Sequence, residues 1–460
     1  MSSKWRCSAM VLLALLAVTG AAGGRQTADG GIDESRQLAA DTPPAITPQC
    51  DSSPLLIANV NVWTAGGMRE RQDVRLSGGR VAAIAPSRRQ SGYRGRSLDG
   101  AGDTLLPGLI DVHLHFVVPG GLPAGARPGE AADVAGRQLL RSGVTSGRVH
   151  LDSLDNARTL KARSDVDCEP LPRVQVGGPG LSGAAARDAP EFWSVKTAAD
   201  AAAKVERIAA AGVDWVALHN ADKWPEDVLQ AIVTTARSGH VRLMGAGTTA
   251  EEIAAVLRAR PDTLDYLAAN AEADYPPQLL ELLRQQSNLV LVPTFGIFHR
   301  VGAYVDRAGL VEDTANFEFL PPDHRSHVLQ AATKALAERT RPRGLGAMPR
   351  KLAQLRALGL PLATGTDAGS ALHFQAGAIW WELEAWRTFG ASHRQALTAA
   401  TADAARVLRG WDVGRLAVGQ RADFVLYRGD VETGPFDASR VRAVGKGGVL
   451  YVVDGKWIGP

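Results

Sequence analysis

The sequence predicts an α/β protein: a (β/α)8 TIM-like barrel with a small composite β-sandwich domain built from both termini. Two observations predict this fold. Short strand-like segments separated by glycine turns occur near both ends of the chain, and the stretch between them alternates strand-like segments with alanine-rich amphipathic ones. Repeated strand and helix units over about 300 residues suit a closed parallel barrel better than two separate dinucleotide-binding domains.

The composition is that of an ordinary globular protein. Its 460 residues are 45% hydrophobic and 22% charged, and 51 basic residues against 48 acidic ones give a net charge of +3. These values exclude a disordered tail protein, a collagen-like repeat and a disulfide-stapled miniprotein. They also give no electrostatic footprint for nucleic acid or an anionic membrane. We therefore expect a small-molecule substrate and no nucleic-acid partner.

Residues 1–22 have the pattern of a secretory signal peptide. Two basic residues precede the apolar run from Ala9 to Val18, and small residues follow up to a cleavage point near Ala21. A membrane anchor is the alternative, but the run is about half of the roughly 20 residues that cross a bilayer. We expect a periplasmic or secreted protein with no stable membrane insertion after signal removal, and a flexible leader over residues 23–53.

Two cysteines, Cys50 and Cys168, remain after removal of this segment. They could pair in an oxidising compartment. Two cysteines alone do not establish a bridge, so the sequence leaves both states open.

Residues 54–106 and 406–460 are expected to form the composite β domain. Its strand-like segments are 55–63, 73–76 and 80–84 near the start, and 422–427, 441–444 and 448–456 near the end.

Residues 107–405 are expected to form the barrel. Helices such as 198–211 and 250–258 lie between the strand candidates, which are 108–113, 144–149, 173–176, 215–219, 241–244, 289–293 and 362–364. No glycine-rich dinucleotide fingerprint follows a strand, and Pro179 removes an amide donor from the glycine loop 177–180. This argues against phosphate binding in that loop.

The most informative segment runs from Leu106 to His115, at the end of the first barrel strand. Side chains alternate along a strand, so His113 and His115 point to the same side, into the mouth of the barrel. Their separation suits two imidazoles on one metal ion. Such a pair also occurs by chance, so its context decides.

The segment Pro-Gly-Leu-Ile-Asp-Val-His-Leu-His at 107–115 resembles the opening signature of the amidohydrolase superfamily, in particular its imidazolonepropionase-like and prolidase-like metal-dependent hydrolases. Segments 143–146, 363–368, 399–405 and 414–423 resemble later motifs of that family, in the same order. The resemblance covers about 54–458. It implies hydrolysis of carbon–nitrogen bonds other than peptide bonds, in an amide, cyclic amide or dipeptide-like substrate.

Asp367 matches the aspartate of the family's eighth-strand motif. The resemblance implies a metal ligand that takes a proton from the attacking water and returns it to the leaving group. The alternative is a helix-capping or turn residue, which its Thr-Asp-Ala-Gly context also permits.

Three ligands that the resemblance leads us to expect are absent. Ala217 stands where the fourth strand would carry a carboxylated lysine, segment 242–247 has no histidine, and Tyr266 stands where the sixth strand would carry one. A two-metal centre of the usual kind cannot be built from the remaining residues.

Two explanations follow. In the first, a single divalent ion, expected to be zinc, is bound by His113, His115 and Asp367 with water completing the shell. His219 could be a further ligand, because it points to the same side of its strand as Ala217; it could equally line the cleft or lie in a loop. In the second, the site has decayed and the barrel is a non-catalytic binding protein.

Three further residues are candidates for substrate binding. Arg148 and His150 could both face the pocket and bind a substrate carboxylate, or be solvated loop residues. Tyr266 could donate a hydrogen bond to a substrate oxygen, or fill the space of the missing histidine. Isomerisation or decarboxylation is a third possible chemistry, because a barrel alone does not specify the reaction.

Overall fold

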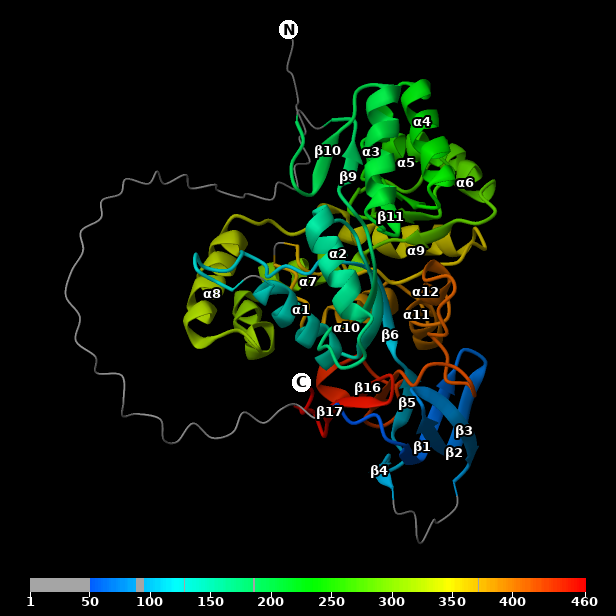
Figure 1. The fold of residues 1–460 in the computed structure, drawn as a ribbon, viewed down its shortest axis with the longest axis vertical. Coiled ribbons are helices and arrows are strands. Elements are labelled where there is room, and N and C mark those ends of the chain that lie inside the picture. Colours follow the sequence, from blue (N-terminus) through cyan, green and yellow to red (C-terminus); the bar gives the residue numbers. More distant parts are fainter. Residues whose placement is uncertain (1–49, 88–94, 128, 185–186, 371) are drawn as a thin grey trace, which may run out of the picture. The chain divides into compact units, whose positions relative to one another are not determined.

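The computed structural model describes residues 50–87, 95–127, 129–184, 187–370 and 372–460 (Figure 1). The predicted signal peptide at 1–22 and the leader up to residue 49 lie outside the described residues. Within these ranges the chain has the predicted α/β class. No helix in these ranges is both long and apolar enough to cross a membrane.

A nine-stranded sheet contains strands from both ends of the chain. Its order is β18-β17-β16-β15-β5-β1-β2-β3, and β4 pairs with β1. Phe424 of β15 pairs with Pro107 of β5 in antiparallel register, which joins the two ends. The strands are β1 (Leu55–Thr64), β2 (Gly67–Ser77), β3 (Arg80–Pro86), β4 (Arg96–Asp99), β5 (Thr104–Pro107), β15 (Phe424–Tyr427), β16 (Val441–Lys446), β17 (Val449–Val453) and β18 (Lys456–Trp457).

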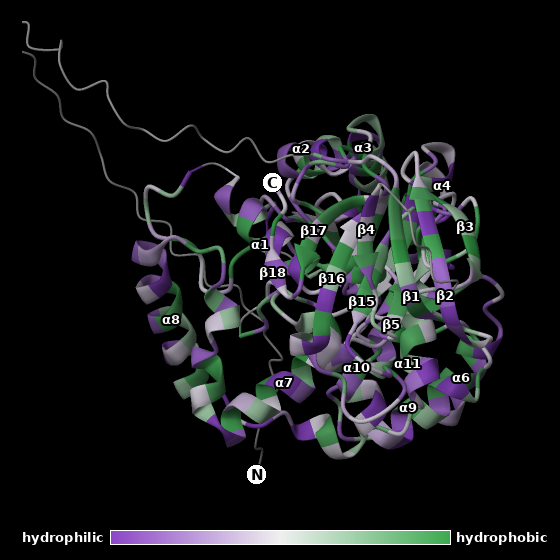
Figure 2. Ribbon diagram, turned by 90° about the horizontal axis from the view of Figure 1, so that it is seen from below, coloured by the Kyte–Doolittle hydropathy of each residue, from purple (hydrophilic) through white to green (hydrophobic). Residues whose placement is uncertain are grey.

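Alternating apolar residues give this sheet its own small core. Leu55 and Ile57 of β1 pack in one cluster with Val74 of β2 and Phe424 of β15. Arg69, Glu70 and Arg71 of β2 are exposed, and Figure 2 shows purple bands on this strand. All these strands belong to one hydrogen-bonded sheet, so a two-layered sandwich stays a prediction.

The middle of the chain contributes eight parallel segments. Residues 362–368 form the eighth segment, which pairs only through isolated bridges. The others are β6 (Leu109–Leu114), β7 (Val144–Val149) and β8 (Arg173–Val176) in one sheet, and β11 (Trp215–His219), β12 (Arg242–Ala246), β13 (Thr263–Asp265) and β14 (Val290–Val292) in a second, which also holds β9 (Gly180–Ser182) and β10 (Phe192–Ser194).

Isolated bridges connect these pieces in succession. Gly177, after β8, pairs with Trp215 of β11. The eighth segment pairs with β14 through Leu362 and Leu291, and with β6 through Ala368 and Leu114. Tyr266 was expected at the end of the sixth strand, and β13 ends directly before it. Segment 362–364 is not a regular strand, because only Leu362 and Ala368, at the two ends of the eighth segment, form parallel bridges.

Helices follow most of these strands. Among the predicted helices, 198–211 and 250–258 correspond to α3 and α5. The helices are α1 (Glu130–Arg141), α2 (Leu154–Ser164), α3 (Ala198–Ala210), α4 (Glu226–Ser238), α5 (Ala250–Leu257), α6 (Pro277–Arg284), α7 (Phe295–Asp306), α8 (Pro322–Ala337), α9 (Met348–Arg356), α10 (Ala378–Thr388), α11 (His393–Ala399) and α12 (Ala404–Val407). Short 3-10 turns are η1 (Ala221–Lys223), η2 (Ala308–Glu312), η3 (Thr314–Phe317), η4 (Arg343–Gly346) and η5 (Ala438–Arg440).

The sequence of α3 shows why these helices form and pack. Thr197 caps its N-terminus by accepting a hydrogen bond from the amide of Asp200. Ala201, Val205 and Ile208 lie on one face and are buried in the main core. The spacing of apolar residues thus directs one face of the helix towards the sheet.

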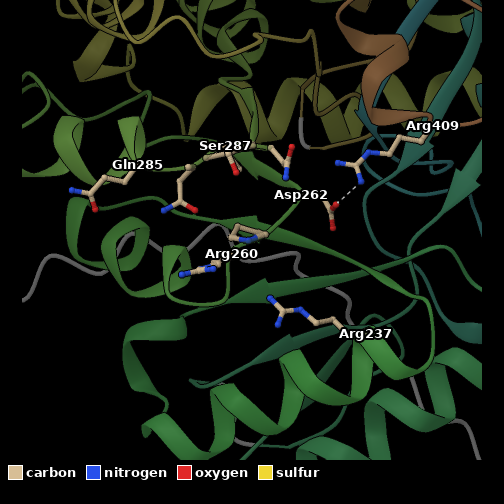
Figure 3. A pocket seen from close by; sticks show the side chains of 10 residues that line it. Arg237, Arg260, Asp262, Gln285, Ser287 and Arg409 are labelled. Atoms are coloured by element: carbon tan, nitrogen blue, oxygen red, sulfur yellow. Dashed lines mark ion pairs between the residues drawn. The ribbon is translucent and has the colours of Figure 1, made fainter.

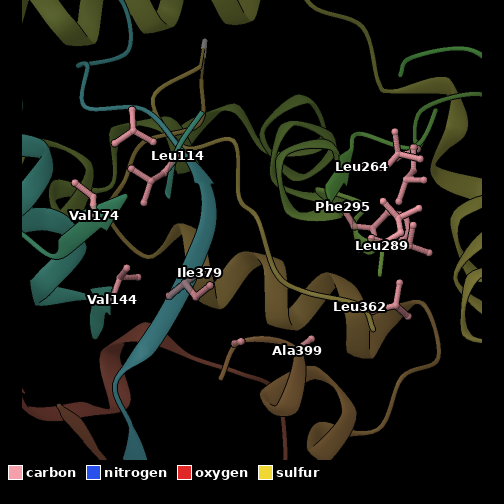
Figure 4. Close-up of a cluster of buried hydrophobic side chains, with 14 of the residues drawn as sticks. Leu114, Val144, Val174, Leu264, Leu289, Phe295, Leu362, Ile379 and Ala399 are labelled. Atoms are coloured by element: carbon pink, nitrogen blue, oxygen red, sulfur yellow. The ribbon is translucent and has the colours of Figure 1, made fainter. Parts of the chain in front are cut away.

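Apolar side chains pack on both faces of the parallel segments. Outward-facing side chains pack under the helices, where Figure 4 shows Val144 and Val174 on one side and Leu264, Leu289 and Leu362 on the other. A second cluster, which includes Ile110, Val112, Trp215, Ala217, Met244 and Val292, is formed by other side chains of the same strands. Packing on both faces fixes the ends of these strands, where the candidate site lies.

Candidate metal centre

The site lies where the parallel segments end. His113 is near the end of β6 and His115 just after it, His150 follows β7, His219 ends β11, Tyr266 follows β13, and Asp367 is in the eighth segment. The carboxyl ends of barrel strands are where barrel enzymes place their active sites. The structure therefore brings together every candidate residue except Arg148 at this end, and Arg148 lies one layer below.

His113, His115 and Asp367 form one contact group. His115 Nε2 lies 3.1 Å from Asp367 Oδ1, and His113 Nε2 lies 3.5 Å from the same oxygen. His113 Nε2 is buried without a hydrogen-bond partner among the described residues. Burial would raise the pKa of Asp367, but the two imidazoles next to it, one of them hydrogen-bonded, outweigh burial and hold the pKa below its usual value. Asp367 is therefore an ionised acceptor beside two nitrogen atoms.

Asp111 holds Asp367 in place. Its carboxylate accepts hydrogen bonds from the Thr366 amide (3.0 Å) and hydroxyl (2.6 Å) and from the amide of His113 (3.1 Å). Burial raises the pKa of Asp111 to about 6, against these hydrogen bonds. Asp367 has a left-handed backbone with φ of 58°, a conformation that favours glycine and is found at strained functional positions.

Asp265 is the second carboxylate next to His113. His113 Nδ1 lies 2.6 Å from Asp265 Oδ2, and both side chains are fully buried. Burial by itself opposes protonation of His113, but the hydrogen bond with Asp265 and the nearby Asp367 carboxylate outweigh it and raise the pKa of the imidazole to about 9. The imidazole thus lies between two carboxylates.

Arg148 lies below this layer, and each of its three guanidinium nitrogens donates a hydrogen bond within the protein. It donates to Asp265, to the Val112 carbonyl (2.7 Å) and to the Thr263 hydroxyl (2.6 Å). Its guanidinium also lies 4.8 Å from the centre of the Trp215 ring. Binding of a substrate carboxylate by Arg148 stays a prediction, and these contacts favour a role inside the protein.

His150 lies flat against His113. The ring centres are 3.9 Å apart with an angle of 15° between the planes. His150 Nδ1 is 3.2 Å from the sulfur of Met244, and its Nε2 is buried without a hydrogen-bond partner among the described residues. Burial, with the neighbouring His113, lowers the pKa of His150 well below its usual value. The imidazole is therefore neutral near pH 7, which does not favour pairing with a carboxylate.

His219 and Tyr266 border the same space. The His219 ring contacts His150, with centres 5.2 Å apart, and Phe192, with centres 5.0 Å apart. Burial lowers the pKa of His219 to about 4. The Tyr266 ring lies edge-on to His113, with centres 4.8 Å apart, and burial raises the pKa of its hydroxyl well above the usual value. Tyr266 therefore keeps its proton and can donate it in a hydrogen bond.

Two groups of side chains have the spacing of metal ligands. One is His113, His115 and Asp367; the other is His113, His150 and Asp265, and the donor atoms of each lie within 4.8 Å of one another. Two imidazoles and a carboxylate fit a zinc-like ion in an open catalytic site. The unpartnered His113 Nε2 next to Asp367 makes the first group the better fit. His219 is in neither group, so its role as a ligand stays a prediction.

Among the described residues, two positions where the family's other ligands are expected carry apolar side chains. Ala217 and Met244 lie in one apolar cluster with Val292. Ala217 stands where the family's lysine is expected, and Met244 is on the strand that lacks the expected histidine. Apolar contacts thus fill this part of the site.

Sequence reasoning assigned no role to Asp265 or to His373. Asp265 directly precedes Tyr266, so the sixth-strand motif already pointed to this position. His373 is buried with both ring nitrogens lacking hydrogen-bond partners among the described residues, and burial lowers its pKa well below the usual value. No spacing in the sequence marks His373, because it approaches the site through the loop after Asp367.

A polar pocket of about 470 Å³ lies elsewhere (Figure 3). Its arginines are Arg237, Arg260 and Arg409, and Arg409 pairs with Asp262 at 3.2 Å. Residues that precede β13 and β14 line it, whereas the metal-centre residues follow their strands. This pocket is therefore separate from the candidate site.

Comparisons with known proteins show which solved structures have a similar fold. The chain is similar in fold to molinate hydrolase, with a TM-score of 0.68, 17% identity, and coverage of 86% of this chain and 94% of that one. A Xaa-Pro dipeptidase with bound methionine gives a TM-score of 0.66, 19% identity, and coverage of 87% and 100%. Phenylurea hydrolase B gives a TM-score of 0.67, 17% identity, and coverage of 86% and 96%.

In sequence, 61 residues are 41% identical to N-acetylglucosamine-6-phosphate deacetylase of Lysinibacillus sphaericus, which is 13% of this chain and 15% of that protein. The chain thus matches only a small part of that relative's length. The model of the amidohydrolase family matches residues 104–458. This match spans most of the chain and includes His113, His115 and Asp367. It confirms the family that the motif at 107–115 predicted. The chain belongs to the amidohydrolase family.

Proposed function

We propose that this protein hydrolyses carbon–nitrogen bonds in small molecules with one divalent metal ion, zinc or a similar ion, held by His113, His115 and Asp367. The observation that carries the proposal is the convergence of two imidazole nitrogens on one carboxylate oxygen, at 3.1 and 3.5 Å. The orphaned His113 Nε2 supports it, because a buried polar atom without a partner calls for a ligand.

We also propose that the eight parallel segments form one closed (β/α)8 barrel. The isolated bridges from Gly177 to Trp215, from Leu362 to Leu291 and from Ala368 to Leu114 support closure. A closed barrel would surround the site with the ends of all eight segments.

A divalent ion bound to this group would lower the pKa of a water molecule and polarise a substrate carbonyl. Asp367, ionised and in contact with both histidines, would accept the proton of the attacking water and deliver it to the leaving nitrogen. The Tyr266 hydroxyl would donate a hydrogen bond to the carbonyl oxygen as negative charge develops there. Arg148 takes no part in this scheme, because its side chain is fully buried and each of its guanidinium nitrogens already donates to a group inside the protein.

The strained backbone supports an active site over a decayed one. Tyr266, Thr294 and Asp367 have left-handed backbones, with φ of 66°, 51° and 58°. Each follows a barrel strand or lies in the eighth segment. Such strain is costly and is retained where a side chain must be aimed. The competing function, a binding protein without catalysis, is favoured by the apolar residues at Ala217 and Met244.

We propose an exported protein. The signal-like segment at 1–22 supports this location. The disulfide between Cys50 and Cys168 also supports it, because such bonds persist in oxidising compartments.

Turnover of a substrate panel tests the function. Zinc-loaded protein is incubated with N-acyl amino acids, dipeptides and cyclic amides, beside chelator-treated protein and Asp367→Asn. We expect hydrolysis of at least one class, loss with chelator, recovery with zinc, and a rate about 10²–10⁴-fold lower in Asp367→Asn. Saturable binding of a compound that is never turned over would favour the binding protein. Conversion without hydrolysis would indicate isomerisation or decarboxylation.

A further inference from the structure

We propose that Asp265 is a positioning residue for the metal centre: it holds His113 in the tautomer that leaves Nε2 free for the ion, and Arg148 keeps Asp265 charged for this task. This inference rests on the proposed function. It concerns a carboxylate that touches neither the substrate nor the ion, and it assigns Arg148 a partner inside the protein.

The first step concerns the charge of Asp265. The side chains of Asp265 and Arg148 are both fully buried and form an ion pair. A guanidinium does not lose its proton in proteins, so the buried cation requires an anion next to it. Thr263 satisfies the remaining Asp265 oxygen, to which its hydroxyl donates at 3.0 Å. Asp265 is therefore an ionised carboxylate with partners for both oxygens.

The second step concerns the proton of His113. An ionised carboxylate only accepts hydrogen bonds. Asp265 Oδ2 lies 2.6 Å from His113 Nδ1, so Nδ1 must carry the hydrogen and donate it. With Nδ1 donating to Asp265, Nε2 is the ring nitrogen that is left for an ion, and it is the atom that lies 3.5 Å from Asp367 Oδ1. The buried carboxylate thus presents the correct nitrogen of His113 to the ion.

The third step excludes Asp265 as a ligand itself. Although Asp265, His113 and His150 have the spacing of a metal group, Arg148 bonds to the same Asp265 oxygen that faces His113. A cation placed there would lie next to the guanidinium. The separation of 2.6 Å between Oδ2 and Nδ1 is also too short for an ion bound to both atoms at about 2.0–2.2 Å in tetrahedral geometry. Asp265 therefore acts through His113.

The positioning of His113 by Asp265 affects metal binding more here than it would in a site with many ligands. Only three side chains surround the proposed ion, so the orientation and basicity of each imidazole contribute a larger share of the binding free energy. A carboxylate that accepts a hydrogen bond from a ligating histidine fixes its tautomer and raises its basicity, and removing such a partner typically weakens metal binding 10–100-fold.

The test measures ion binding without any substrate. Zinc affinity is obtained by competition with a chromophoric chelator, and the absorption spectrum of bound cobalt reports the ligand geometry. We expect Asp265→Asn to bind zinc about 10–100-fold more weakly and to show an altered cobalt spectrum. The control is Asp73→Asn in β2, a buried carboxylate that accepts a hydrogen bond from the amide of Asn59 (2.9 Å) away from the site. Asp73→Asn should keep wild-type zinc affinity even where it is less stable.

Asp265→Asn leaves Arg148 as an unpaired buried cation, so a second variant guards against misfolding. Asp265→Asn combined with Arg148→Met removes both charges, and we expect the same loss of zinc affinity and the same spectral change. Wild-type affinity in a folded variant overturns the positioning role while the proposed function stands. Wild-type protein that binds no ion contradicts the proposed function, and this inference with it.

Discussion

Tyr266 separates the proposed one-ion site most clearly from the two-ion site that the family's sixth-strand motif leads one to expect. It stands where a histidine ligand is expected, and its ring remains in contact with His113. Its hydroxyl stays protonated because burial raises its pKa. In the proposed site the tyrosine would supply a hydrogen-bond donor where a ligand is expected.

The variant Tyr266→Phe tests whether the hydroxyl acts as a hydrogen-bond donor. We expect Tyr266→Phe to keep its zinc affinity and to lower kcat about 10²–10³-fold, because a donor to the developing negative charge is lost. The measurement is steady-state kinetics beside zinc titration. An unchanged kcat would mean that the ring only fills space.

The sequence predicted some of these residues and not others for a physical reason. His113 and His115 share one strand end, so local alternation alone places them together. Asp265 lies 152 positions from His113 in the chain, and no local pattern records that the side chain at the end of β13 reaches the one near the end of β6. Arg148 was predicted near the site, but its depth depends on contacts with Thr263 and Asp265 that only the fold provides.

At the scale of elements, the segment between α2 and β8 joins the nine-stranded sheet to the parallel strands. Cys168 in this segment forms the disulfide with Cys50, which precedes β1, and the Cα atoms are 5.5 Å apart. The sequence had left this pairing open. Arg173 of β8 pairs with the buried Asp423, whose carboxylate also accepts from the amide of Gly447. Asp423, in the motif at 414–423, thus has a structural contact here.

Removing the disulfide tests its contribution to this junction. We expect the double variant Cys50→Ser, Cys168→Ser to unfold at lower denaturant concentration, with a loss of about 2–4 kcal/mol, because the bond closes a long loop of the unfolded chain. Zinc affinity should not change, since the bond is remote from His113. Equal stability, or an intact mass that shows two free thiols in the oxidised wild type, would contradict the assignment.

At the scale of the whole described chain, Lys446 of β16 connects the same two regions. Its ammonium donates to the carbonyls of Val166 (3.3 Å), Glu169 (2.9 Å) and Leu171 (2.6 Å). Burial, with Arg173 nearby, lowers the pKa of Lys446 to about 7 from 10.5. The folded protein therefore binds this proton less tightly than the unfolded chain does.

The sign of the pH dependence follows from this shift. Between pH of about 7 and about 10.5 the unfolded chain binds more protons at Lys446, so the free energy of unfolding should rise with pH in this window. Denaturant titrations at several pH values check this, with Lys446→Met as the control that lacks the group. The wild-type value minus that of Lys446→Met should increase with pH. A difference that is flat or that decreases would contradict the lowered pKa.

The proposed function depends on the binding of one divalent ion by His113, His115 and Asp367. Elemental analysis of protein that has been supplied with zinc and then dialysed tests it most directly. We predict about one zinc ion per wild-type chain, and none in a folded chain that carries His113→Ala and His115→Ala. Wild-type protein with no bound metal after zinc is supplied, or a double variant that keeps its zinc, would contradict the account.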